Sequence, residues 1–166
     1  MKVTFPSAEF FRALQALMQG ERERFKRLGY FDATIGVRVL DAPRGTQAYV
    51  LQFEVFDCTQ VRSTTDLGSE PVDFVLEGDF EVWAEMLRNI TTHGAADLEH
   101  SINTLTHLGE RMRVTYDDPD GHDKLYRFAE SVQQFFDLAG QLDIDFSDTS
   151  VARVADATAS AARGAR

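Results

Sequence analysis

The chain has 166 residues, of which 17 are Lys or Arg and 27 are Asp or Glu, so its formal net charge is −10. This acidic balance argues against a nucleic-acid partner, because phosphate binding relies on Lys and Arg. The length is that of one domain with a substantial core. Cys58 is the only cysteine, and the N-terminus has no apolar leader, so we expect a cytoplasmic protein without an intrachain disulfide. No run of 18 apolar residues occurs, so no integral membrane association is expected.

The first half of the chain predicts one helix followed by strands. Ser7 follows Pro6 as an N-cap, and apolar residues then recur at helical spacing up to Gly29. Residues 33–39 and 47–57 alternate apolar and polar side chains, which is typical of a sheet with one covered face. Residues 58–65 are weaker evidence for a short polar strand, and residues 72–77 form the next strand.

The second half predicts three amphipathic helices and one more strand. The helices span residues 79–90, residues 95–108, which end at a Gly109 stop, and about 18 residues ending at Gly140. Residues 111–116 form the strand between the last two helices. From residue 148 the composition turns polar, so we expect a domain over residues 1–147 and a disordered tail over residues 148–166.

The apolar faces of these helices exceed what a solid core needs, and the surplus can line a pocket for an apolar ligand. Phenylalanine is abundant, at 13 residues, and buries a large apolar area without a polar group. We therefore predict a ligand-binding pocket on one sheet face. Its predicted lining is Trp83, Met86, Leu87, Ile90, Leu98, Ile102, Leu105, Phe128, Val132 and Phe135.

Two motifs that invite a metal hypothesis do not sustain it. His93, His100 and His107 are spaced by seven residues, which on a helix separates neighbours by about 10.5 Å, too far for one ion. Residues 117–123 resemble a calcium loop, but aligning the glycine puts Tyr116 and Arg127 at ligand positions. We read this segment as a turn in which Asp120 or Asp123 caps the last helix, and we predict no metal and no cofactor.

The order of elements carries a family resemblance. In residues 73–87, DFVLEGDFEVWAEML, a strand leads directly into a helix with an aromatic residue and then leucine. In residues 95–114 a helix ends at a glycine and a strand follows. Over residues 7–140 the chain resembles the sterol carrier protein family of small lipid-transfer domains. It departs from the family pattern in residues 94–102 and in the long acidic turn after the fifth strand.

The resemblance implies an α/β (α+β) domain. It would have a single mixed sheet of four to five strands, covered by about four helices, with an apolar tunnel between the layers. It also implies non-catalytic binding or transfer of a fatty acid, a fatty acyl-CoA or a sterol or steroid. A homodimer or an enzyme partner remains open.

Two alternatives remain. A small cone-fold isomerase or dehydratase would draw on Tyr49, Asp57, His93 and Tyr116, but such folds place most helices before a run of curved strands. An accessory subunit of a lipid- or steroid-degrading enzyme would have its pocket filled by side chains. We find no catalytic signature, and Cys58 has no histidine near it in sequence to act as a base.

Overall fold

The computed structural model describes residues 2–107 and 111–147, which form a mixed five-stranded sheet with the strand order β4-β3-β2-β5-β6. β2 pairs with β5 in parallel, and the other neighbours are antiparallel. The strands are β2 (Ala33–Leu40), β3 (Gln47–Glu54), β4 (Asp57–Thr64), β5 (Phe74–Asp79) and β6 (Met112–Thr115). The predicted fold class and strands are confirmed, and the weakly indicated strand 58–65 is β4.

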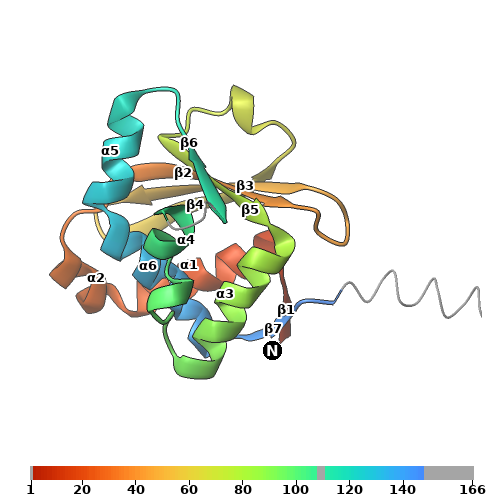
Figure 1. Cartoon of the computed structure of the whole chain (residues 1–166). Helices are drawn as coiled ribbons and strands as arrows, with labels where there is room; N and C mark the ends of the chain where they lie inside the picture. The colour runs from red at the N-terminus through yellow and green to blue at the C-terminus, as the bar shows by residue number, and fades with distance from the viewer. Residues whose placement is uncertain (1, 108–110, 148–166) are drawn as a thin grey trace, which may run out of the picture.

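The helices lie mainly on one face of this sheet, as predicted (Figure 1). They are α1 (Ala8–Gly20), α2 (Arg22–Leu28), α3 (Phe80–His93), α4 (Ile102–His107), α5 (Pro119–Arg127) and α6 (Ala129–Asp137), with short 3-10 turns η1 (Leu67–Ser69), η2 (Leu98–His100) and η3 (Leu138–Gln141). The opposite face carries only a small apolar cluster of Val50, Leu67 and Val75 in the described chain. The main core therefore sits between the sheet and the helices.

Two predicted helices are each divided into two. Ser7 caps α1 by accepting a hydrogen bond from the Phe10 amide at 3.0 Å, as predicted. The helix then ends at Glu21, whose φ of −115° and ψ of 36° leave the helical region, and α2 begins at the next residue. The last helix breaks in the same way at Phe128, whose ring packs 5.4 Å from that of Phe31. This contact holds the side chain against the core while the chain changes direction.

The segment predicted as one helix over residues 95–108 is also divided. Asp97 accepts a hydrogen bond from the His100 amide at 3.0 Å and caps the short turn η2. Ser101 has extended backbone angles, and its hydroxyl accepts from the Thr104 amide at 3.2 Å at the start of α4. Both side chains satisfy amides that a continuous helix would have bonded to its own carbonyls. The Gly109 stop lies outside the described residues, as does the predicted tail 148–166.

A second, two-stranded sheet was not predicted. β1 (Lys2–Thr4) pairs in parallel with β7 (Asp143–Asp145), which brings the two ends of the described chain together beside α3 (Figure 1). Three-residue strands are too short to show a clear period-2 pattern, so this pairing depends on tertiary structure.

Candidate ligand-binding site

Two hollows stand out in the described structure. One, of about 940 Å³, lies between β1, the start of α1 and the β2–β3 turn, and we call it the N-terminal groove. The other, of about 300 Å³, lies between α4 on one side and α5 and α6 on the other, and we call it the α4–α6 pocket. Ile102, Leu125 and Ala129 supply apolar lining to the α4–α6 pocket, whereas His107, Tyr126 and Glu130 are exposed residues of its lining.

The position of α5 depends on a close approach to the start of β5. Asp118 caps α5 by accepting from the Asp120 amide at 3.0 Å, so the predicted caps Asp120 and Asp123 were wrong. A Cβ on Gly121 would meet the Asp73 carbonyl oxygen at 1.8 Å, so only glycine allows this packing. Lys124 then donates to the Asp73 carboxylate at 3.0 Å. These contacts place Leu125 and Tyr126 at the pocket.

The opposite wall, α4, is tied to α6 through one glutamine. The Ile102 amide donates to Gln133 Oε1 at 2.8 Å, and Gln133 Nε2 donates to Asp137 Oδ1 at 2.9 Å. The same carboxylate accepts from the Ala96 amide at 3.1 Å. Asp137 is buried, and this burial raises its pKa. The start of α4 is therefore fixed, because an amide without a partner would be costly in this buried position.

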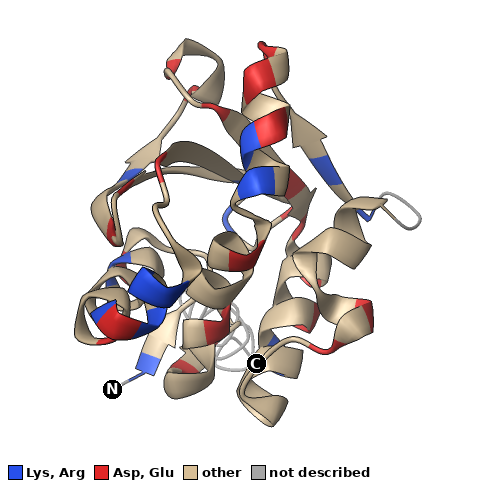
Figure 2. Cartoon of the chain, turned by 90° about the vertical axis from the view of Figure 1, so that its left-hand side faces the viewer, with Lys and Arg blue, Asp and Glu red and all other residues tan. Residues whose placement is uncertain are grey.

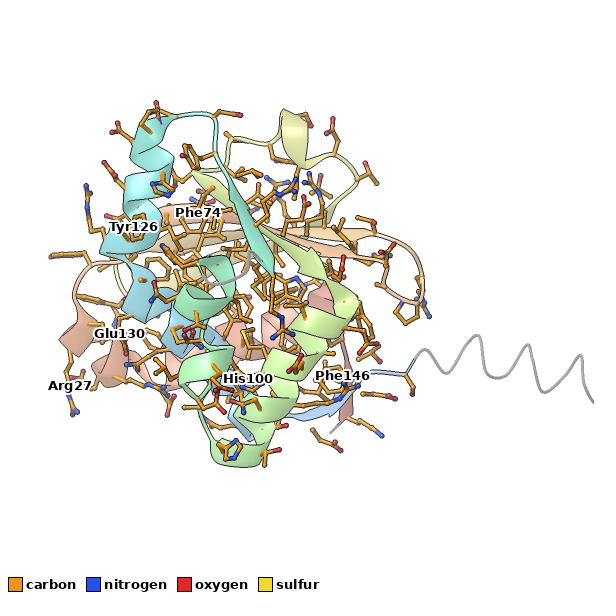
Figure 3. All side chains as sticks on the ribbon, viewed as in Figure 1. Arg27, Phe74, His100, Tyr126, Glu130 and Phe146 are labelled. Carbon is orange, nitrogen blue, oxygen red and sulfur yellow. The ribbon has the colours of Figure 1, made fainter. Side chains whose placement is uncertain are left out.

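A histidine–tyrosine contact borders the exposed end of the pocket. His107 Nε2 lies 2.7 Å from the Tyr126 hydroxyl, which links the end of α4 to α5. His107 Nδ1 lies 2.8 Å from the Asn103 carbonyl oxygen. Tyr126 and Glu130 lie on the same outer flank of α5 and α6 (Figure 3). A polar rim thus surrounds an apolar floor, which is the usual composition of a small-molecule site.

Comparisons with known proteins establish which fold holds this pocket. No protein-family model matches the sequence, and no curated protein does. A solved structure of a conserved hypothetical protein from Thermus thermophilus, described as possibly a sterol carrier protein, is similar with a TM-score of 0.61 and 17% identity, covering 85% of this chain and 91% of that one. A crystal structure of sterol carrier protein 2 matches with a TM-score of 0.60 and 15% identity, covering 82% and 97%. The chain has the sterol carrier protein-like fold.

Within this sterol carrier protein-like fold, most of the ten predicted ligand residues pack together in the core. Trp83, Met86, Leu87 and Ile90 on α3 are completely buried, as is Phe135 on α6. Leu105 and Val132 are also buried, and Phe128 is half-buried. Of the ten, Ile102 alone lines the α4–α6 pocket, and none lines the N-terminal groove. Neither hollow is lined by a residue of α3, so neither corresponds to the apolar tunnel that the resemblance implies between the sheet and the helices.

Leu98 is placed differently from the prediction. Its side chain is 83% exposed, because it lies on η2 rather than on a helix that faces the core. His100 is half-buried and bonds to Asp97 at 2.6 Å and to Glu85 at 3.2 Å. The hydrogen bond to Asp97 raises the pKa of His100. The buried apolar face that the sequence predicted to include Leu98 therefore begins at Ile102.

Besides Leu125 and Ala129, the pocket residues absent from the predicted lining are polar. Tyr126, Glu130 and Gln133 follow one another at spacings of four and three, so they share a helix face despite the break at Phe128. A search for apolar stripes passes over such a face. His107 was considered only as a metal ligand, and within residues 2–107 and 111–147 no group of three His, Cys, Asp or Glu gathers as a metal site.

The four residues considered for a cone-fold enzyme do not converge. Tyr49 pairs with Ser63, whereas Asp57 pairs with Glu54, at the other end of the same hairpin. His93 and Tyr116 are exposed on other elements. Burial raises the pKa of Tyr49 to about 12, so its phenol stays protonated at neutral pH.

Cys58 is fully buried on β4, as a small strand residue rather than a nucleophile. Burial raises the pKa of its thiol to about 12, which disfavours the reactive thiolate. The helices of the described ranges lack the length and apolar character needed to cross a membrane.

Proposed function

We propose that this protein binds or transfers an apolar small molecule, of the class of fatty acids, fatty acyl-CoA or sterols and steroids, without catalysing a reaction. The observation that carries the proposal is the α4–α6 pocket, which has an apolar floor, opens to the surface and lies in a sterol carrier protein-like fold. Its volume of about 300 Å³ is at the lower end of the range for small-molecule sites.

The apolar part of the ligand would extend from this pocket toward the core. Ile102 lines the pocket floor, and Leu105 lies one helical turn further along α4, on its buried side. A small outward movement of the C-terminal end of α4, beyond its fixed start, would open a path to the apolar side chains of α3 and α6. The ten residues named from the sequence, other than the exposed Leu98, form the lining that we propose for this opened state. Each buried Å² of apolar ligand surface would contribute about 25 cal/mol.

Filling the pocket tests the proposal. Ala129 is half-buried in the α4–α6 pocket, and Ala8 is half-buried in the N-terminal groove, so Ala129→Phe and Ala8→Phe form a matched pair. Titration with a fluorescent fatty acid or sterol analogue should show binding by the wild type and by Ala8→Phe, but not by Ala129→Phe. If Ala8→Phe alone abolishes binding, the ligand occupies the N-terminal groove instead. If the wild type binds no analogue, the proposal fails.

A second candidate is an accessory subunit of a lipid- or steroid-degrading enzyme. The complete burial of the apolar α3 side chains Trp83, Met86, Leu87 and Ile90, with the Trp83 and Phe136 rings 5.5 Å apart, favours a core filled by the protein itself. Native mass spectrometry of the purified protein distinguishes the two candidates. A co-purified lipid supports the carrier, whereas a ligand-free chain in complex with an enzyme supports the accessory role. We further propose a cytoplasmic location, consistent with the single buried thiol.

A further inference from the structure

We infer that the α4–α6 pocket selects apolar ligands whose polar end is an uncharged hydrogen-bond donor, such as a hydroxyl group, over ligands that end in a carboxylate or phosphate. This inference deepens the proposed function and rests on it. Three features of the pocket rim carry it: the direction of the histidine–tyrosine hydrogen bond, the carboxylate of Glu130, and the positions of the nearby cations.

The histidine–tyrosine contact leaves an acceptor facing the pocket. The Asn103 carbonyl oxygen can only accept, so with a neutral imidazole Nδ1 of His107 carries the hydrogen that bonds it. Nε2 is then an acceptor, and the Tyr126 hydroxyl donates its one hydrogen to it at 2.7 Å. The free lone pairs of the Tyr126 oxygen remain available to a donor on the ligand.

Glu130 adds a negative charge to the same rim. One of its carboxylate oxygens accepts from Gln134 at 2.9 Å, while Arg24, the cation that also bonds Gln134, forms its ion pair with Glu21. A ligand hydroxyl could donate to this carboxylate, whereas an anionic ligand would be repelled by it. The effect is larger at a partly enclosed site than in bulk water, because the effective dielectric constant is lower there.

The cations of α5 point away from the pocket. Leu125 and Tyr126 line the pocket. At 100° per residue around the helix axis, the flanking Lys124 and Arg127 lie about 150° from the direction midway between Leu125 and Tyr126. Lys124 is already bonded to Asp73, and the guanidinium of Arg127 lies 5.9 Å from the Phe128 ring centroid. Figure 2 shows no charged residue on α4, the helix that runs into the short grey trace at 108–110.

Most of the other hydrogen-bond donors of the rim already have partners within the protein. The Thr106 hydroxyl donates to the Ile102 carbonyl oxygen at 2.8 Å, and Ser101 donates to the Leu98 carbonyl oxygen at 3.2 Å. The Gln133 amide bonds within the wall of the pocket. Asn103 is exposed, and its side-chain amide is a further neutral donor of the described rim, beside the second Nε2 hydrogen of Gln133. A carboxylate would thus meet only neutral donors and one like charge, whereas a hydroxyl would meet two acceptors.

Equilibrium binding of radiolabelled hexadecanol and hexadecanoate at pH 8 tests the inference, because the two probes differ only at the polar end. We expect the alcohol to bind wild-type protein about tenfold more tightly. Glu130→Gln should raise the affinity for hexadecanoate about three- to tenfold, by removing the repulsion, and leave that for hexadecanol within about twofold. Glu81→Gln, which makes the same charge change at an exposed site on α3, should change neither affinity.

A second variant adds the missing cation. Asn103→Lys should raise the affinity for hexadecanoate and not that for hexadecanol. Equal binding of both probes with no response to Glu130→Gln would overturn the selectivity while the proposed carrier function stands. Tighter binding of hexadecanoate by the wild type would also overturn it. Binding of neither probe would overturn the inference and the proposed function together.

Discussion

Gly121→Ala is expected to destabilise the protein through a single backbone contact. The added Cβ would lie 1.8 Å from the Asp73 carbonyl oxygen and 2.9 Å from its carbon, where real contacts essentially never fall below 3.0 Å. Either α5 or the start of β5 must therefore move by more than about 1 Å, since the obstacle is backbone and cannot rotate away. This movement would disturb the Lys124–Asp73 ion pair and the buried Leu125.

The net cost is the balance of two effects. Overpacking of this kind costs about 1–3 kcal/mol and occasionally more. The higher helix propensity of alanine returns about 1 kcal/mol. Because the overlap here is with backbone, we expect a net loss of about 2 kcal/mol or more, which for a chain of this size lowers Tm by about 4–8 °C.

Urea unfolding followed by Trp83 fluorescence measures this change, and the chain offers a matched control. Gly20 ends α1, and a Cβ there would meet nothing within 4 Å, so Gly20→Ala should be neutral or stabilise by up to about 1 kcal/mol. A Gly121→Ala protein as stable as the wild type would refute the packing argument. Loss of ligand binding by Gly121→Ala would further indicate that the packing of α5 against the start of β5 shapes the α4–α6 pocket.

Four further expectations concern single sites. Ile102→Phe should weaken ligand binding with little change in stability, because its ring can enter the pocket; a loss of about 1–3 kcal/mol in urea unfolding would instead indicate a solid core. Cys58 should react with a thiol reagent only after unfolding, since it is buried and its pKa is raised to about 12, and Cys58→Ser should fold and bind ligand. The hydrogen bond to Asp97 raises the pKa of His100. Protonated His100 therefore contributes its full stabilisation below about pH 6.5 and loses it as the pH rises through the raised pKa. His100→Gln should lower Tm at pH 6 and not at pH 9. Deleting residues 148–166 should leave Tm within a few degrees, and a large drop would contradict their assignment as a polar tail.

The sequence alone determined which residues share a face. Alternation over residues 33–39 and helical spacing around Trp83 predicted β2 and α3 correctly, because side chains alternate along a strand and recur every 3.6 residues along a helix. Ser7 marked the start of α1 for a similarly local reason, since its hydroxyl bonds an amide three residues later.

Only the tertiary structure decided where these faces bend and how closely they meet. The breaks at Glu21 and Phe128 preserve the apolar spacing on either side, so periodicity does not reveal them. Leu98 fits a helical stripe in sequence, yet the caps at Asp97 and Ser101 turn the chain and leave it exposed. The α4–α6 pocket arises because helices distant in sequence meet at a distance set by their contacts with the sheet and with one another. Such distances are properties of packing between segments, which no local pattern of residues records.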